Sequence, residues 1–270
     1  MSFLARRRTR GRRSVAILAV GALMTFHVLA IVGTPSAFAI ASCTFSGGTL
    51  SIVLSSGNSI VFSQNASGPI LVNGANTTAA PCSTTRATVT NTTAISVSGF
   101  TGDEDVTIKM DVAGADTTIV SWGTINWMID LPSGTGDSVT IDGSNLTTDD
   151  LDIALGASGI DLNNDDNLDV TLAAVEDVFV DGGDGDDTIW AAGSTATGAA
   201  FTVNLTATGG DGGGDGKDTL QGGAGNDTLK GNAGNDTLKG AAGNDRLNGG
   251  PGDDICKGGS GADSVTKCEL

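Results

Sequence analysis

The sequence contains no tyrosine and only one histidine, His27, among its 270 residues. His27 lies in an N-terminal segment that we expect to be removed, so the mature chain would contain no histidine. Without histidine, a protein cannot form a Ser-His-Asp or Cys-His catalytic arrangement or an H-E-x-x-H zinc site. These absences exclude the common classes of serine and cysteine hydrolases and of zinc proteases.

Positive charge is also scarce in this chain. There are 14 Lys and Arg residues against 31 Asp and Glu residues, and six of the arginines but none of the acidic residues fall within residues 1–39. The mature chain would therefore carry a net charge of −23. A charge of this sign and size argues against nucleic acid as a partner and against binding to anionic membranes or inserting into them. It favours cations as partners instead.

Residues 1–39 have the pattern of a signal peptide. Six arginines precede an apolar run at residues 15–32, and Ala37-Phe38-Ala39 forms an A-x-A cleavage site. We therefore expect cleavage after Ala39 and a secreted, extracellular product. The pair Arg12-Arg13 leaves a twin-arginine export route open beside the general one. The apolar run is also long enough to span a bilayer, so an uncleaved anchor is the alternative.

Glycine, by contrast, is abundant, with 41 residues, and much of it falls in a repeat. Six nine-residue units run without a break over residues 213–266, each with Gly at positions one and four and Asp at position six. In chain order the units are GGDGKDTLQ, GGAGNDTLK, GNAGNDTLK, GAAGNDRLN, GGPGDDICK and GGSGADSVT. A seventh copy, GGDGDDTIW, stands apart at residues 182–190.

Each unit predicts one tight turn followed by one very short strand. Glycine allows the close backbone approach and left-handed conformations that such turns need, and the Asp adds carboxylate oxygens beside the turn carbonyls. An oxygen-only set of ligands suits calcium better than zinc. Two units should make one coil, so successive Asp residues should alternate between its two sides. The predicted metal ligands are Asp187, Asp218, Asp227, Asp236, Asp245, Asp254 and Asp263.

The units resemble the RTX, or haemolysin-type, calcium-binding nonapeptide GGxGxDxUx. The resemblance implies Ca²⁺ as the bound ion and a parallel β-roll that holds ions between successive turns. Asn232 and Ala241 depart from the pattern because each replaces the second glycine, and Cys256 replaces the aliphatic residue at position eight. Without calcium, stacked aspartates repel one another and three-residue strands bury little apolar surface, so we expect folding of the array to depend on calcium.

The rest of the mature chain predicts short strands separated by Gly, Asp and Asn turns, and so an all-β fold without helices. We expect an irregular β-solenoid that leads into the β-roll, with an N-terminal β-rich segment at 40–99, the solenoid at 100–212 and the β-roll at 213–270. A small β-sandwich is the alternative for residues 43–99. The β-rich runs fall at residues 50–54, 60–62, 70–72, 87–90, 95–97, 106–110, 118–120, 125–129, 139–141, 151–153, 170–172 and 178–180.

Residues 88–190 resemble the segment that precedes the repeats in secreted actinobacterial calcium-binding proteins of this type. A second group of candidate calcium ligands lies within this stretch. The group comprises Asp161, Asn163, Asp165 and Asp169. Their spacing resembles the start of an EF-hand loop, although Asp166 replaces the expected glycine. The alternative is an acidic turn between strands.

Four cysteines remain in the predicted mature chain. An even number in an exported protein favours two disulfides. Proximity suggests Cys43 with Cys82 and Cys256 with Cys268, although four cysteines allow three pairings. The second pair would clip the end of the repeat array.

Two functions fit these features. The first is a calcium-stabilised structural or adhesive module outside the cell. The second is a calcium-dependent, polysaccharide-acting enzyme whose site lies in the middle segment. Acidic residues and the tryptophans Trp122, Trp127 and Trp190 could serve a carbohydrate site, but most of the Asp falls in turns, and large aromatics in short strands more often pack in a core.

Overall fold

The computed structural model describes residues 40–54, 57–65, 70–72, 75–76, 87–88, 90–99, 102–113, 115–119, 122, 125–132, 134–143, 150–210 and 216–269. The predicted signal peptide lies outside these residues. Every regular element among them is a β-strand, which confirms the all-β prediction. The described residues contain no helix long and apolar enough to cross a lipid bilayer.

The strands form two sheets, which we name sheet A and sheet B. In spatial order, sheet A contains β1 (Ile40–Ser46), β2 (Thr49–Leu54), β6 (Ala94–Ser98), β9 (Asn126–Asp130), β13 (Val170–Ala173), β12 (Gly159–Asp161), β11 (Asp152–Gly156), β15 (Thr188–Trp190), β17 (Thr219–Gln221), β19 (Thr237–Ala242) and β21 (Ile255–Ser260). Sheet B contains β22 (Ser264–Thr266), β20 (Arg246–Asn248), β18 (Thr228–Lys230), β16 (Asn204–Thr208), β14 (Asp177–Asp181), β10 (Ser138–Asp142), β7 (Asp105–Ala113), β3 (Ser59–Asn65), β4 (Ile70–Val72) and β5 (Ala75–Asn76), with β8 (Ala115–Ile119) paired to β7.

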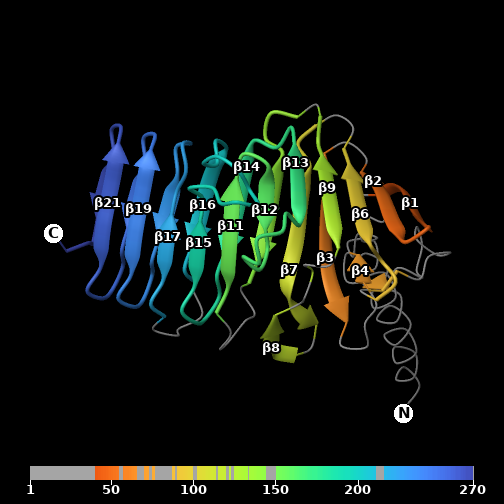
Figure 1. The fold of residues 1–270 in the computed structure, drawn as a ribbon, viewed down its shortest axis with the longest axis horizontal. Coiled ribbons are helices and arrows are strands. Elements are labelled where there is room, and N and C mark those ends of the chain that lie inside the picture. Colours follow the sequence, from red (N-terminus) through yellow and green to blue (C-terminus); the bar gives the residue numbers. More distant parts are fainter. Residues whose placement is uncertain are drawn as a thin grey trace, which may run out of the picture. The chain divides into compact units, whose positions relative to one another are not determined.

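The chain alternates between the two sheets through the repeats, and each strand pairs in parallel with the strand one coil away (Figure 1). Thr219 lies beside Thr237 in sheet A, and Thr228 lies beside Arg246 in sheet B. Equivalent residues of successive coils are 18 positions apart. Two nine-residue units therefore make one coil, and the prediction of a parallel β-roll is confirmed.

Parallel pairing extends upstream of the repeats. Strands β2, β6, β9 and β13 pair in parallel in sheet A, as do β3, β7, β10, β14 and β16 in sheet B. Antiparallel pairs occur at β1–β2, at β3–β4–β5 and at the β11–β12–β13 insertion. Because β2 and β3 belong to the same ladders as the later strands, residues 43–99 do not form a separate β-sandwich. The domain boundaries at residues 99 and 212 stay predictions.

The strand expected at residues 87–90 is formed only in part: the Ala87 carbonyl accepts the N–H of Ile70 of β4 at 3.1 Å and Thr88 forms a β-bridge, whereas Thr90 lies in a turn. The carbonyl oxygen of Thr88 accepts hydrogen bonds from the N–H groups of Asn91, at 3.2 Å, and Thr92, at 3.0 Å. These local bonds make a turn, because the chain must reverse before β6. The sequence analysis also missed β1, β5, β12 and β16. Strands β1, β5 and β12 pair antiparallel with their neighbours, and β16 pairs in parallel with β14 and β18.

Large apolar side chains fill the upstream coils. Trp122 and Trp127 are 1% and 2% exposed, and their rings pack edge to face with centroids 5.2 Å apart. Phe62 packs edge to face against Trp127 at 4.9 Å. Trp122 and Trp127 are therefore core residues and offer no surface for stacking a sugar.

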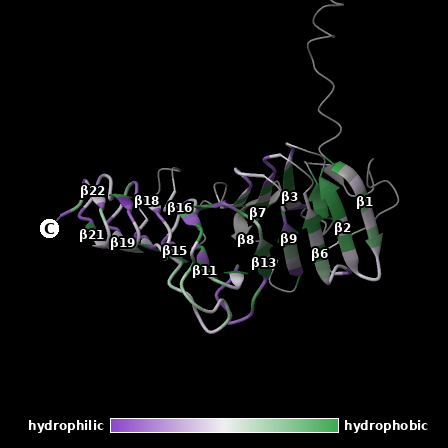
Figure 2. Cartoon of the chain, turned by 90° about the horizontal axis from the view of Figure 1, so that it is seen from above, coloured by the Kyte–Doolittle hydropathy of each residue, from purple (hydrophilic) through white to green (hydrophobic). Residues whose placement is uncertain are grey.

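The repeats bury much less apolar surface for each strand. Strands β17, β18, β19 and β20 each contribute one fully buried leucine, namely Leu220, Leu229, Leu238 and Leu247. Figure 2 shows the same trend, with hydrophobic residues concentrated on strands such as β2 and β6 and paler or hydrophilic colouring over β18–β22. The apolar core thins from the upstream coils into the repeats.

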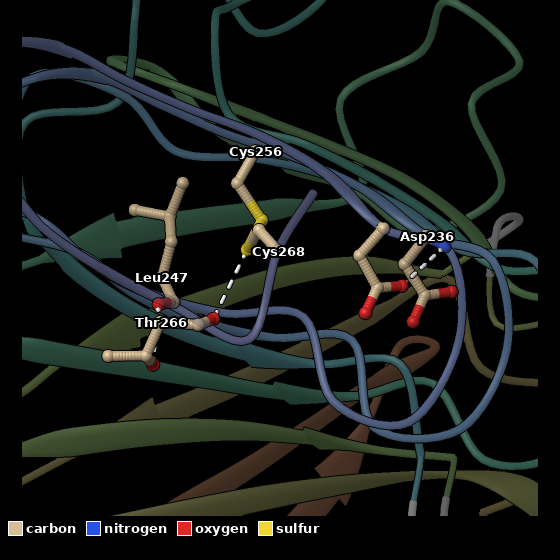
Figure 3. Close-up of a disulfide and its surroundings, with 6 residues drawn as sticks. Asp236, Leu247, Cys256, Thr266 and Cys268 are labelled. Atoms are coloured by element: carbon tan, nitrogen blue, oxygen red, sulfur yellow. Dashed lines mark hydrogen bonds between the residues drawn. A yellow bond between two sulfur atoms is a disulfide. The ribbon is translucent and has the colours of Figure 1, made fainter. Parts of the chain in front are cut away.

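A disulfide joins Cys256 to Cys268 at the end of the array, as predicted, with a Cα–Cα distance of 5.8 Å (Figure 3). The tail then returns to the last strand of sheet A, because Glu269 forms a parallel bridge with Ile255 and its N–H donates to the Asp254 carbonyl at 2.8 Å. The tail thereby covers part of the open edge of β21. Cys43 is buried, and Cys82 lies outside the described residues, so their pairing stays a prediction.

Candidate metal centre

The aspartates that precede the sheet A strands of the repeats form a continuous ladder. The N–H of Asp187 donates to Oδ1 of Asp218, that of Asp218 to Oδ1 of Asp236, and that of Asp236 to Oδ1 of Asp254, each at 2.9 Å. Asp187 is 31 residues before Asp218, yet it occupies the next rung. The separate seventh copy of the repeat is therefore continuous with the array in space.

A second ladder precedes the sheet B strands. The N–H of Asp227 donates to Oδ1 of Asp245 at 2.9 Å, and the N–H of Asp245 donates to Oδ1 of Asp263 at 3.0 Å. The structure thus has the two-sided alternation expected from the nine-residue period. Asp263 is only partly buried because it lies in the last coil, whereas the other six predicted ligands are at most 2% exposed.

The second carboxylate oxygen of several ladder residues is buried without a hydrogen-bond partner. This holds for Oδ2 of Asp187, Asp236, Asp245 and Asp254. Oxygen atoms of the neighbouring coil lie nearby, since a Cβ added to Gly231 would overlap both Asp236 Oδ2 and the carbonyl oxygen of Gly249. The first glycines of the copies that begin at Gly182, Gly222, Gly231, Gly240 and Gly249 therefore keep open a space between a carboxylate and a carbonyl of the next coil.

The residues present fit calcium. Their donors are carboxylate and carbonyl oxygens, which are the ligands of a hard cation that accepts flexible coordination. Among the described residues, no three His, Cys, Asp or Glu side chains gather into one metal-binding group. Any ion held by a ladder must therefore take backbone carbonyls as well as carboxylates. Such an ion would supply positive charge that compensates the buried carboxylate oxygens.

Burial perturbs the protonation of the ladders. It raises the pKa of Asp187 and of Asp218 to about 7, against the opposing hydrogen bond that each accepts from a backbone N–H. The neighbouring carboxylates raise both pKa values further. Burial raises the pKa values of Asp227, Asp236 and Asp245 in the same way. A rise in pKa means that the folded array disfavours these negative charges unless a cation compensates them.

The structure also contains a ladder at position five of the units that the sequence analysis missed. Oδ1 of Asn226 accepts the N–H of Asn244, and Oδ1 of Asn244 accepts the N–H of Ala262, each at 2.8 Å. On the other side, Oδ1 of Asn235 accepts the N–H of Asp253 at 2.9 Å. These amides join successive turns without metal. The signal was visible, because three consecutive units have Asn at this position.

Two departures from the repeat pattern keep the glycine conformation. Asn232 and Ala241 have φ angles of 71° and 80°, in the left-handed region. Asn232 is held there by its side-chain amide, which donates to Thr208 Oγ1 and to the Gly210 carbonyl, both at 2.7 Å. Ala241 has no such side chain and is the strained position of the array.

The second group of candidate ligands, Asp161, Asn163, Asp165 and Asp169, lies on and after β12. Oxygens of Asp161 accept the N–H groups of Asp165, at 3.2 Å, and Asp166, at 3.0 Å, and Asp169 Oδ2 accepts that of Leu162 at 2.8 Å. Burial, with the charges of Asp161 and Asp165, raises the pKa of Asp169 to about 6. These contacts are those of an acidic turn that links β12 to β13.

Of the comparisons with known proteins, the one with family models agrees with this geometry. No curated protein and no solved structure matches the chain. The family model described as RTX calcium-binding nonapeptide repeat (4 copies) matches residues 176–194, 212–245 and 231–265, which contain both Asp ladders. The chain therefore contains RTX, or haemolysin-type, calcium-binding nonapeptide repeats over these residues.

Proposed function

We propose that calcium folds the repeat array, and that the ladder aspartates are its carboxylate ligands. The observation that carries this proposal is the row of buried Oδ2 atoms without a partner beside carbonyl oxygens of the next coil. The proposed ligands are the seven predicted from the sequence: Asp187, Asp218, Asp227, Asp236, Asp245, Asp254 and Asp263.

The energetics support dependence on the ion. Strands β17–β20 each bury one leucine and β22 leaves Val265 44% exposed, so apolar burial falls short of the conformational entropy lost by so many ordered glycines. Extracellular modules bind calcium with dissociation constants of about 0.1–1 mM, and a tenfold excess of free ion adds roughly 1.4 kcal/mol for each site. Several such sites filled together would stabilise an array that does not fold alone.

The biological role we propose is that of a structural or adhesive module outside the cell, exported by the predicted signal peptide. The regular stacking of coils and the high negative charge support a rigid calcium-stabilised element. No observation favours the alternative of a polysaccharide-acting enzyme, since Trp122 and Trp127 are buried and only Trp190 is substantially exposed, at 38%.

Calcium titration of the mature protein, followed by circular dichroism, tests the proposal. Strand signal should rise with calcium, fall again with EGTA, and respond far less to magnesium, whose octahedral geometry the sites do not impose. An identical strand signal in EGTA and in saturating calcium would refute calcium-dependent folding.

A matched pair of variants assigns the ligands. Asp236→Asn removes a charge from the middle of a ladder and should raise the calcium concentration at the folding midpoint several-fold. Asp253→Asn removes the same charge from an exposed position five residue and should leave the midpoint nearly unchanged. Equal midpoints for the two variants would exclude Asp236 as a ligand.

A further inference from the structure

A further row of acidic residues precedes three strands of sheet B upstream of the tandem repeats, and the first two of these residues are buried. Glu104 precedes β7, Asp137 precedes β10 and Glu176 precedes β14. Glu104 and Asp137 are both 0% exposed. None of the three turns matches GGxGxDxUx in full, although Gly99, Gly102 and Val106 occupy positions one, four and eight relative to Glu104, and the sequence analysis did not identify these acidic residues.

The hydrogen bonds of this row reproduce those of the Asp ladders. The N–H of Glu104 donates to Oδ1 of Asp137 at 2.6 Å, and the N–H of Asp137 donates to Oε2 of Glu176 at 3.0 Å. As in the repeats, each acid donates its backbone N–H to the acid of the next coil. The spacing is 33 and 39 residues instead of 18, because the upstream coils are longer.

One oxygen of this row is left open, as in the repeats. Glu104 Oε1 accepts the N–H of Gly57 at 3.0 Å, but Glu104 Oε2 is buried without a hydrogen-bond partner. A Cβ added to Gly134 would overlap both the Gly102 carbonyl oxygen and the Asp137 carboxylate, and one added to Gly99 would lie 2.8 Å from Glu104 Oε2. Glycines therefore keep space for two carboxylates and a carbonyl oxygen.

Among the described residues, no basic side chain forms an ion pair with Glu104 or Asp137. The one ion pair among the described residues joins Lys109 to Asp142 at 2.7 Å and does not involve the pair. Burial raises the pKa of Glu104 against the hydrogen bond from Gly57, and the charge of Asp137, the hydrogen-bonding contact between the two carboxyl groups and the charge of Asp103 raise it further. Buried charges are normally paired with an opposite charge or bound to a metal ion. The two buried carboxylates therefore call for a cation.

We propose that Glu104 and Asp137, with the Gly102 carbonyl, bind a divalent cation of the calcium type at a site separate from the repeats. The site would join the coils that contain β7 and β10 in the way that ions join the repeat coils. The competing account of the same geometry is a proton shared between the two carboxyl groups, which would need no ion.

Counting calcium ions per folded chain by native mass spectrometry separates the two accounts. Glu104→Gln and Asp137→Asn should each bind one ion fewer than the wild-type protein at saturating calcium. Asp130→Asn is the matched control, because Asp130 is an exposed carboxylate at the end of β9 in the other sheet, and its ion count should equal that of the wild type. Unchanged numbers of bound calcium ions in both site variants would overturn the proposal and favour a proton shared between the two carboxyl groups.

The same count in a repeat variant keeps this inference separate from the proposed function. A chain that carries Asp218→Asn, Asp227→Asn, Asp236→Asn and Asp245→Asn loses four ladder carboxylates. It should still lose one further ion when Glu104→Gln is added, because the upstream site does not use the repeats. Hydrogen exchange of β7 and β10 checks folding in parallel, and native protection combined with an undiminished ion count in Glu104→Gln would again refute the site.

Discussion

The upstream coils and the repeat coils share one architecture but fill it differently. In sheet B, Val139 lies beside Val178 and Val178 lies beside Leu205, so an apolar column runs through the upstream coils. The next residue in this column is Asp227, whose Oδ1 accepts the N–H of Leu205 at 2.9 Å. From there the column continues as carboxylates. The repeats thus place the ladder aspartates, which are the proposed ion ligands, where the upstream coils place aliphatic side chains.

Sheet A changes in the same way. Leu151 is 1% exposed, and its N–H donates at 2.7 Å to Oδ1 of Asp187, the first rung of the ladder. In both sheets the change occurs where the nonapeptide pattern begins, although the first ladder coil of sheet A, from Asp187 to Asp218, is still 31 residues long. One backbone arrangement is thus filled by apolar side chains upstream and by carboxylates in the repeats. If ions stabilise the repeats as we propose, the two halves should respond differently to solution conditions.

Acidification of the calcium-free protein should give the largest difference in response between the upstream coils and the repeats, because several buried carboxylates of the repeats titrate together. Their folded-state pKa values are raised, to about 7 for Asp187 and Asp218, above the ordinary value of 3.8. The folded array therefore binds more protons than the unfolded chain, and its stability falls as pH rises from about 4 to 7. Strand signal in EGTA should increase as the pH is lowered from 7.5 to 5.

Saturating calcium should reverse this dependence, since protons compete with the ion for the same oxygens. A calcium-free array that loses strand signal on the same acidification would contradict the assignment of raised pKa values to the ladders.

Trp127→Ala should destabilise the upstream coils by about 3–5 kcal/mol, with or without calcium, because it removes a buried ring packed on Phe62 and Trp122. Chemical denaturation measures the change. Trp190→Ala is the control, and at 38% exposure it should cost much less. A cost for Trp127→Ala that disappears in saturating calcium would mean that the upstream core also depends on the ion.

Loss of the terminal disulfide should affect only the repeats. The bond closes a loop between residues 12 apart in sequence, and the chain-entropy argument assigns about 3 kcal/mol to a loop of this length. The double variant Cys256→Ser, Cys268→Ser should therefore need more calcium to fold, while the upstream unfolding transition stays in place. An unchanged calcium midpoint would show that the tail contributes little.

Ala241→Gly should stabilise the array by about 1 kcal/mol, because Ala241 has a φ of 80° that costs an L-residue about this much. Ala242→Gly is the matched control at the end of β19, and it should destabilise by about 0.5–1 kcal/mol because the unfolded chain gains freedom. Calcium titrations of both variants measure the shift. The same sign for both would contradict the conformational explanation.

The repeats could be predicted well from sequence because their period specifies the coil, the two-sided arrangement of Asp and the inward position of residues such as Leu238. The upstream coils were harder. Strand β12 has only three residues, and its place between β11 and β13 follows from pairing partners that no local pattern reveals. Glu104 and Asp137 were missed because they are 33 residues apart and the upstream coils have no constant length that would connect them.

The most direct test of the central claim is hydrogen exchange, resolved by region, in saturating calcium and in EGTA. Removal of calcium should abolish backbone protection in β17–β22 and largely preserve it in β6, β7, β9 and β10, because apolar burial stabilises those strands. Equal protection of β17–β22 in the two conditions would contradict the account, since it would mean that the array is stable without its ions.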